Sequence, residues 1–477
     1  MNRFVCLITL LLALSAWGQP TGFPGQTALP AQATGSQRVA LAARVVPTAD
    51  QLAWHRLGLT AFVHFGINTF TGREWGDGTE DPSLFCPGHL DCEQWVRTLQ
   101  QAGVQLVILT AKHHDGFCLW PTATTAHSVK SSAWRGGRGD VVRELSDACH
   151  RLGMRFGVYL SPWDRNAPCY GQGESYNRLY LQQLTELLTQ YGQVDEVWFD
   201  GANGEGPAGR RQQYDWSSVL ATIRRLQPHA IAANMGPDVR WVGNEDGTGR
   251  ETEWSATVLP PVSYPQGLCQ REALGINEMS PDLGSRALVA RAEQIYWYPA
   301  EVDVSIRPGW FYHAAEDTNV KTLPQLIDIY YNSVGRNAVL LLNVPPTPQG
   351  RIAAVDSVRL AELGHYLRRT FSRNLLAQGD AAFSGEVFSS AQFAVTPGAT
   401  VSVVQLCEDV TCGQRVEEFT VEGLVDGRWQ PLARGTTVGV KRLLRFPACR
   451  PDSLRVRVTA SRGPFRLIGI AAYCDED

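Results

Sequence analysis

The sequence has no excess of basic residues. Its 477 residues include 43 Lys and Arg against 47 Asp and Glu, which gives a formal net charge of −4 at pH 7. Proteins that bind nucleic acids usually present a basic surface to the phosphates. The composition therefore gives no support to a nucleic-acid partner.

Long apolar runs are also missing after the N-terminus. The first run, residues 4–14, is too short to be a good membrane span, and no later segment reaches 18 uninterrupted apolar residues. Arg3 precedes this run and small residues follow it before Gln19, as in a secretory signal peptide. We therefore expect residues 1–18 to be removed and the mature chain to be exported, either to the periplasm or out of the cell.

The sequence contains no C-x-x-C motif and no Cys/His spacing of the zinc-binding kind, so a structural zinc ion is not expected. Eleven cysteines are present, and ten would remain once Cys6 leaves with the signal peptide. An exported protein meets oxidising conditions. Cys86 and Cys92, and likewise Cys407 and Cys412, are close enough in sequence to close local loops, although spacing alone does not fix the pairing.

Two compositions follow one another in the mature chain. Residues 19–40 are rich in Pro, Gly, Thr, Ala and Gln, which predicts a flexible lead-in. Over residues 41–375, apolar runs typical of buried parallel strands alternate with helical patterns. The strand candidates are LTAFVHFG, VQLVILTAKHH, RFGVYLSPW, DEVWFDG, AIAANMG, EVDVSI and AVLLLNV. These repeated βα units predict an α/β fold with a (β/α)8-type barrel in which one strand is irregular.

Helix boundaries inside this region carry capping signals. Asp91 precedes one helical pattern and Gly103 follows it, and Asp140 and Gly153 stand in the same positions around another. Asp is a preferred N-cap residue, and Gly is preferred just beyond a helix C-terminus. These signals support the alternation of helices and strands.

Residues 376–477 lack helical patterns and contain short alternating strands, with a hairpin turn signal at Asp426-Gly427. They predict a C-terminal antiparallel β-sandwich. We expect this domain to brace the barrel, with carbohydrate binding as the alternative.

Polar and aromatic side chains gather where the predicted barrel strands end. Because the catalytic groups of barrels lie at the C-terminal ends of their strands, these residues are expected to share one rim. They are His64, Lys112, His113, His114, Asp115, Tyr159, Trp163, Asp164, Trp198, Asp200, Arg307, Trp310, Tyr312 and His313. Neighbouring residues on a strand point to opposite faces, so His113 and His114 are not expected to bind one metal ion together.

A second acidic segment, GNEDGTGRETEW, contains Glu245, Asp246, Glu251 and Glu253. A calcium site is the alternative interpretation of such a loop, but the EF-hand pattern is absent. Two carboxylates on neighbouring barrel loops, surrounded by aromatic residues, suit glycoside hydrolysis. One carboxylate attacks the anomeric carbon, and the other, with a raised pKa, protonates the leaving oxygen.

The segments LTAFVHFGINTF, LVILTAKHHDGFCLWPT, EVWFDGANGEG and EVDVSIRPGWFYH resemble the α-L-fucosidases of glycoside hydrolase family 29 in order over about residues 52–344. The resemblance is greatest to the branch that prefers α-1,3/1,4-linked fucose. It implies a retaining enzyme in which Asp200 is the nucleophile and Glu245 the acid/base, with Glu253 and Glu251 as the next candidates. It also implies that the C-terminal sandwich is the family's usual companion domain.

The resemblance further implies a pocket that grips the hydroxyls and the C5 methyl group of fucose. Its expected residues are His64, Glu74, Trp75, His113, His114, Tyr159, Trp198, Arg307 and Trp310. A fucosylated oligosaccharide or glycoconjugate is the expected partner, and no cofactor or metal is expected. A hydrolase of another sugar, or a glycan-binding protein without activity on the same barrel, remains the alternative.

Overall fold

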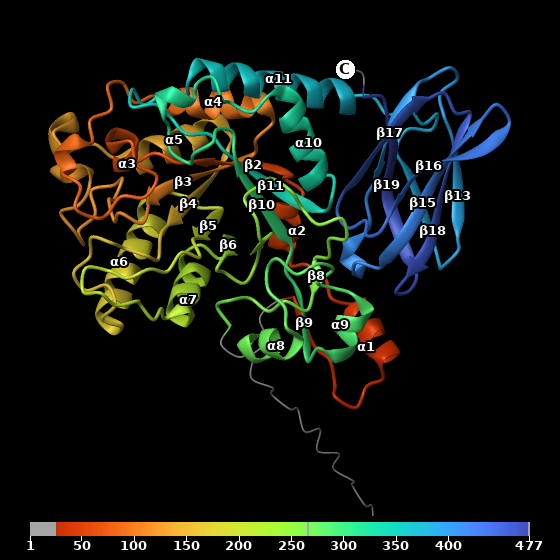
Figure 1. Ribbon diagram of the computed structural model, residues 1–477, viewed down its shortest axis with the longest axis horizontal. Coiled ribbons are helices and arrows are strands. Elements are labelled where there is room, and N and C mark those ends of the chain that lie inside the picture. Colours follow the sequence, from red (N-terminus) through yellow and green to blue (C-terminus); the bar gives the residue numbers. More distant parts are fainter. Residues whose placement is uncertain (1–24, 265–266, 476–477) are drawn as a thin grey trace, which may run out of the picture.

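The computed structural model describes residues 25–264 and 267–475. Figure 1 shows a barrel on the left, a β-sandwich in blue on the right, and a small lobe below the barrel that contains α1 (Gly35–Ala42), α8 (Gly267–Leu274) and α9 (Arg286–Arg291). The long helix α11 (Ala354–Phe371) runs along the top of the barrel toward the sandwich. The predicted signal peptide, residues 1–18, lies outside the described residues.

The barrel is one sheet of eight strands whose neighbours are all parallel, which confirms the predicted fold. In spatial order the strands are β6 (Ile231–Asn234), β5 (Glu196–Phe199), β4 (Arg155–Leu160), β3 (Leu106–Lys112), β2 (Leu59–Val63), β11 (Ala338–Asn343), β10 (Ala300–Ser305) and β7 (Arg240–Trp241). The irregular strand is β7, which has only two residues and therefore shows no apolar run. It meets β6 through a single bridge between Ala233 and Val239, so the barrel is nearly closed.

Helices cover the outside of the barrel, and their ends follow the capping signals. The Asp91 side chain accepts from Gln94 N–H at the start of α4 (Cys92–Ala102), and that of Asp140 accepts from Arg143 N–H at the start of α5 (Val141–Leu152). Gly103 and Gly153 follow these helices in the left-handed region. The helices of the barrel domain are α2 (Ala49–His55), α3 (Ile67–Thr71), α4 (Cys92–Ala102), α5 (Val141–Leu152), α6 (Glu174–Gln190), α7 (Trp216–Leu226), α10 (Leu323–Ser333) and α11.

The inside of the barrel is filled by alternate residues of the strands. Phe62, Ile108, Tyr159 and Trp198 belong to one buried cluster there. Because side chains alternate along a strand, the inward series of β5 continues from Trp198 to Asp200, at the carboxyl end. The strands therefore deliver polar side chains to the top of an apolar core.

The N-terminal segment differs from its prediction. Composition predicts a flexible lead-in up to residue 40, but β1 (Gln26–Ala28) pairs antiparallel with β9 (Gln294–Trp297), and α1 (Gly35–Ala42) packs on α9 (Arg286–Arg291). Thr34 caps α1 through a reciprocal capping box with Gln37. We call this unit, completed by β8 (Ala256–Thr257) and α8 (Gly267–Leu274), the insertion lobe.

The C-terminal domain is an antiparallel β-sandwich, as predicted. Asp426 and Gly427, both with positive φ, turn the chain between β15 (Val416–Val425) and β16 (Arg428–Gly435). Its sheets are β12 (Ala381–Gly385), β19 (Phe465–Tyr473), β14 (Val401–Leu406) and β17 (Arg442–Cys449), and β13 (Ser390–Ala394), β18 (Ser453–Ser461), β15 (Val416–Val425) and β16 (Arg428–Gly435).

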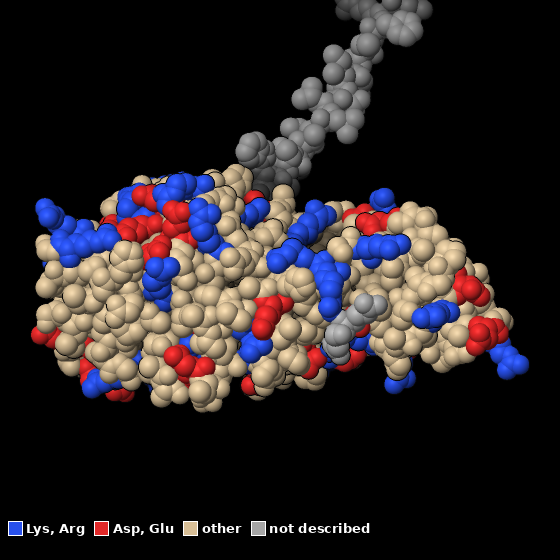
Figure 2. Space-filling view, turned by 90° about the horizontal axis from the view of Figure 1, so that it is seen from above, with Lys and Arg blue, Asp and Glu red and all other residues tan. Residues whose placement is uncertain are grey.

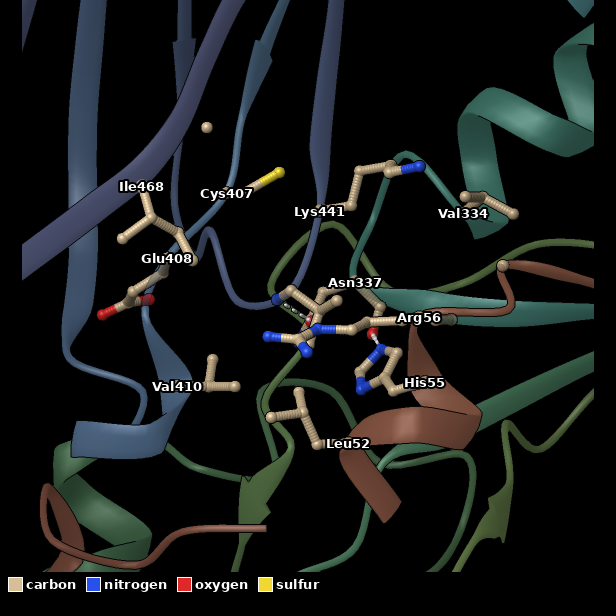
Figure 3. Close-up of a pocket in the computed structure, with 14 residues that line it drawn as sticks. Leu52, His55, Arg56, Val334, Asn337, Cys407, Glu408, Val410, Lys441 and Ile468 are labelled. Carbon is tan, nitrogen blue, oxygen red and sulfur yellow. Dashed lines mark hydrogen bonds between the residues drawn. The ribbon is translucent and has the colours of Figure 1, made fainter. Parts of the chain in front are cut away.

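A groove of about 340 Å³ separates the sandwich from the base of the barrel (Figure 3). His55 at the end of α2 and Asn337 just before β11 lie on the barrel side, and Cys407 and Val410 lie on the sandwich side. These barrel residues lie at the N-terminal ends of the strands, whereas Asp200 follows the carboxyl end of β5. The groove is therefore far from the predicted rim.

Three sequence features have plain structural outcomes. Cys86 is not bonded to Cys92, and Cys407 is not bonded to Cys412.

Within residues 25–264 and 267–475, no helix has both the length and the apolar content to cross a membrane. Basic and acidic side chains both occur across the face seen from above (Figure 2).

Candidate active site

A cavity of about 630 Å³ opens at the carboxyl ends of the barrel strands. Seven predicted pocket residues line it together with both predicted catalytic carboxyls: His64, Trp75, His113, His114, Tyr159, Trp198, Trp310, Asp200 and Glu245. These residues therefore share one site, although other residues of the predicted rim do not line it. Further lining residues are Phe62, Asn234, Met235, Arg240, Trp241, Val262, Arg271, Glu278, Tyr298 and Asp303.

Asp200 is held from two directions. The Tyr159 hydroxyl donates to its Oδ2 at 3.0 Å, and Ala202 N–H donates to its Oδ1 at 2.6 Å. The side chain is 25% exposed, so solvent and ligand reach it, and His114 Nε2 lies 3.8 Å from Oδ2. The strand and these donors orient a carboxylate that is open to the cavity.

The hydrogen-bond network of His64 fixes its tautomer. The Asn343 amide donates to Ser305 Oγ at 2.9 Å and to Trp310 O at 2.8 Å, which leaves Asn343 Oδ1 to accept from His64 Nδ1 at 2.8 Å. Burial lowers the pKa of His64 to about 3. A neutral ring protonated on Nδ1 has its lone pair on Nε2.

His114 has the same tautomer for a similar reason. Ser161 Oγ donates to the Trp163 carbonyl at 2.7 Å and therefore accepts from His114 Nδ1, at 2.8 Å. Burial lowers the pKa of His114, although the charge on Asp200 opposes this, and burial also lowers the pKa of His113 well below the usual value. Neutral imidazoles with Nε2 lone pairs are suited to accept hydrogen bonds from hydroxyl groups.

Glu245 reaches the same cavity from the loop after β7. Burial raises its pKa, and the charges of Asp200 and Asp246 raise it further, while a hydrogen bond with Trp310 opposes them. A carboxyl group whose pKa is raised in this way can hold a proton at neutral pH and donate it. The second carboxyl of the site therefore has the electrostatics of a general acid.

The two other candidates for the acid lie elsewhere. Neither Glu253 nor Glu251 lines the cavity. Glu253 is buried between the guanidinium groups of Arg240 and Arg250, and Glu251 pairs with Arg442 of the sandwich at 3.2 Å. Glu251 therefore joins the barrel to the sandwich, the Glu253 carboxylate pairs within the barrel domain, and the geometry favours Glu245.

Two predicted pocket residues stand behind the cavity. Arg307 does not line it, because its guanidinium group is completely buried between Asp356, at 2.9 Å, and Asp317, at 2.8 Å. Glu74 does not line it either; it accepts from Trp310 N–H at 2.7 Å and contacts His313 Nε2 at 2.7 Å. Both residues shape the loop after β10.

Other rim residues also have structural partners. The Lys112 ammonium group is fully buried and contacts Asp164 at 2.9 Å and Gln183 Oε1 at 2.9 Å. Asp115 accepts from Asn68 Nδ2 at 3.0 Å, and burial raises its pKa to about 7. These buried networks fix the loop after β3, which carries the two pocket histidines.

Several lining residues were not predicted. Trp241, Arg271 and Glu278 come from the irregular strand β7 and the insertion lobe, which show no barrel-strand pattern in sequence. Asp303 comes from a recognised strand, EVDVSI, and one signal could have found it. A carboxyl residue at alternate positions of an otherwise apolar buried strand has to face the barrel interior.

Among the residues that the structure describes, no group of three or more His, Cys, Asp or Glu side chains is arranged to hold a metal ion. In the acidic loop, Glu251 and Glu253 pair with arginines and Glu245 faces the cavity. These three carboxyls of the loop therefore do not converge on one point.

Comparison with known proteins places this site in a family. The family model described as Alpha-L-fucosidase matches residues 72–255 and 270–370. Alpha-L-fucosidase 1 of Arabidopsis thaliana is 42% identical over 90% of this chain and 88% of its own length.

Solved structures agree with this match. A crystal structure from Bacteroides ovatus has a TM-score of 0.93 and 56% identity, covering 95% of this chain and 78% of that one. A Ruminococcus gnavus GH29 fucosidase in complex with fucose has a TM-score of 0.79 and 30% identity, covering 91% and 95%. The family model, which covers more than half of the chain, and these relatives show that the chain belongs to the alpha-L-fucosidases of glycoside hydrolase family 29.

Proposed function

We propose that this alpha-L-fucosidase is a retaining, exo-acting enzyme that removes terminal α-1,3/1,4-linked fucose from branched, Lewis-type glycans, with Asp200 as nucleophile and Glu245 as acid/base. The observation that carries the assignment is the pairing of an oriented, accessible carboxylate with a second carboxyl of raised pKa in one cavity. Retaining glycosidases use two carboxyl groups in these two roles.

The proposed reaction has two steps. In the first, an Asp200 oxygen forms a bond to the anomeric carbon of fucose while Glu245 gives its proton to the glycosidic oxygen, and the rest of the glycan leaves. In the second, Glu245 takes a proton from a water molecule that attacks the same carbon and releases Asp200. Two inversions at one carbon retain its configuration.

The geometry supports a binding role for the histidines. His64 and His114, fixed as Nδ1–H tautomers, are proposed to accept hydrogen bonds from fucose hydroxyls through Nε2. Trp75, which is 54% exposed at the mouth, and Trp310, tilted over His64 with 5.1 Å between ring centroids, offer apolar faces for the C5 methyl group. The seven predicted residues that line the cavity thus fit a small sugar with one apolar edge.

The branched-linkage proposal rests on the wall beyond the catalytic carboxyls. Val262, Arg271 and Glu278 bring polar and apolar surface of the insertion lobe to the cavity. Arg271 pairs with Glu278 and also donates to the Pro260 carbonyl, so this wall is internally bonded. A fixed polar wall on the side of the cavity where the leaving group lies would suit the second and third sugars of a branched glycan.

The proposal is tested by product analysis with three substrates: a Lewis a trisaccharide, an α-1,2-fucosylated lactose and an aryl α-L-fucoside. Fucose release from the trisaccharide, with little from the α-1,2 substrate, is the expected result. Release from the aryl and α-1,2 substrates alone would discard the linkage assignment but keep the enzyme class. A matched aryl galactoside checks the alternative of another sugar.

Configuration and export need separate measurements. Proton NMR during the first minutes of hydrolysis should show α-fucose before mutarotation, and initial β-fucose would contradict the two-step mechanism. We also propose that the chain is exported and cleaved before Gln19. N-terminal sequencing of protein recovered outside the cytoplasm checks this, and a retained Met1 would contradict it.

A further inference from the structure

Strand β10 turns carboxyl groups into the barrel. Ala300 and Val302 pack outside the sheet, so the residues that alternate with them, Glu301 and Asp303, face inward. The Trp198 indole donates to Glu301 Oε2 at 2.7 Å. One pair further up the strand, the Trp241 indole donates to Asp303 Oδ1 at 2.8 Å. Each of these two tryptophans lines the active-site cavity, and each is anchored by a carboxyl of β10.

The Asp303 carboxyl is buried without a cation. The residue is 4% exposed, yet it lines the cavity. Trp241 occupies Oδ1 and the backbone N–H of Asp303 itself contacts the carboxyl, but within the described ranges no other residue donates to Oδ2 or forms an ion pair with Asp303. A buried carboxylate without such a partner is costly, so the neutral form is favoured.

Charges around Asp303 act in the same direction. Glu245 on the loop after β7 and Glu301 on the same strand are the acidic neighbours, and they raise the pKa of Asp303 further after burial has raised it, while the Trp241 bond opposes them. Two arginines also line the cavity. However, Arg240 pairs with Glu253 and Arg271 with Glu278, so both cations already have carboxylate partners.

A neutral carboxyl that accepts on Oδ1 carries its proton on Oδ2, where it can donate. The buried position of Asp303 places this donor deep in the cavity. In an exo-acting enzyme the terminal sugar enters deepest. A hydroxyl acceptor at this depth therefore belongs to the fucose ring.

We propose that Asp303 is a further substrate-binding residue, whose Oδ2–H donates a hydrogen bond to a ring hydroxyl of fucose while Oδ1 holds the Trp241 indole in place. The identity of the sugar rests on the proposed function, whereas the donor role rests on the contacts of Asp303. The rival is an ionised Asp303 that accepts from the hydroxyl instead.

Two substitutions separate these roles. Asp303→Asn keeps an acceptor for Trp241 and replaces O–H with N–H as donor, so its kcat/KM should stay within about 3-fold of wild type. Asp303→Ala removes both contacts and should lower kcat/KM by about 10- to 100-fold on the aryl fucoside and on fucosylated glycans alike. Circular dichroism and the melting temperature check that each variant folds, and the near-isosteric Asn variant keeps the test open if the Ala variant does not.

Each contrary result overturns the proposal. If Asp303→Asn loses as much activity as Asp303→Ala, the carboxylate charge is required. If Asp303→Ala resembles wild type, no donor is needed. If the loss is confined to the branched trisaccharide, the contact is to another sugar. None of the three results would contradict fucose release by the wild-type protein, so the proposed function would still hold.

Aryl fucosides that lack one ring hydroxyl each supply a readout that a purely structural role would not move. For the analogue without the partner hydroxyl, the ratio of kcat/KM between wild type and Asp303→Ala should be smaller than for the parent fucoside, because only the Trp241 contact still differs between the two proteins. The other analogues should keep the full ratio. An equal ratio for every analogue would overturn the contact between Asp303 and fucose.

Discussion

The two halves of the barrel are built differently. From β2 to β6, strands and helices alternate with capped helix ends, and this half carries the histidines, Tyr159 and Asp200. From β7 to β10, a two-residue strand is followed by the insertion lobe, and this half supplies Trp241, Glu245, Glu278 and Asp303. In the proposed function, the regular half supplies most contacts to one small sugar. The irregular half brings the acid, the wall that meets the leaving group, and Asp303 as one further contact to fucose.

The largest expected effect lies in the regular half. Asp200→Ala should lower kcat by at least about 10³-fold on every fucoside, because no covalent intermediate can form. Steady-state kinetics and a melting curve check this. The fold should persist, since the side chain is partly exposed and no buried charge loses its partner. Activity near wild type would remove the nucleophile assignment.

The second effect lies behind the irregular half and concerns stability. Arg307→Ala leaves Asp356 buried without its partner and should lower the free energy of unfolding by about 3–5 kcal/mol. Urea denaturation measures this. The exposed pair Arg178–Glu174 is the control, where Arg178→Ala should cost less than about 1 kcal/mol. If stability is unchanged and KM rises, Arg307 would instead be assigned to the substrate pocket.

Glu245→Gln should lower kcat/KM on glycans by about 10²-fold, and less on aryl fucosides whose leaving groups need little protonation. Glu245 must be protonated to act as the acid, and its pKa is raised. Wild-type activity should therefore fall as pH rises through that pKa. Glutamine does not ionise, so the variant should lack this alkaline fall.

The control for this prediction is Glu251→Gln, which affects a carboxyl at the sandwich interface outside the cavity. It should retain both the activity of wild type and its loss of activity at alkaline pH. If Glu251→Gln lacked this alkaline loss and Glu245→Gln kept it, the acid/base assignment would pass to Glu251.

The smallest effect sharpens the comparison between the halves. Arg271→Ala should lower kcat/KM on the Lewis a trisaccharide by about 10-fold and leave the aryl fucoside unchanged, because one wall contact is lost and the fucose pocket is not touched. Parallel kinetics on both substrates check this. An equal loss on both would mean that the insertion lobe supports the fucose pocket as well.

The sequence predicts the regular half well, for a physical reason. Parallel strands covered on both faces are apolar runs, and helix caps such as Asp91 and Gly103 are local signals. The resemblance added the identity of the sugar, and most of the implied pocket residues do line one cavity. Arg307 and Glu74 lie behind it. A sequence motif shows which residues are close along the chain, but it does not show which way each side chain points.

The irregular half was less predictable because its order comes from distant contacts. Strand β7 is too short to show a period, and β1 forms only because β9 lies beside it. Composition cannot show that Gln26 will pair with Tyr296 of a strand far along the chain. Asp303 was not predicted because its strand is mostly apolar. Only the alternation of side chains along that strand shows that its carboxyl faces the barrel interior.

The pairing of β1 with β9 has a consequence for how the protein is made and handled. The wall beside the leaving group cannot be completed until the beginning of the chain meets a segment synthesised much later, so it is a late, non-local event in folding. A fusion or proteolytic cut inside the first strand would leave β9 paired only with β8, while the barrel strands stay paired. Preparations of this enzyme trimmed through Ala28, so that β1 is lost, should thus keep aryl-fucoside turnover longer than turnover of natural glycans.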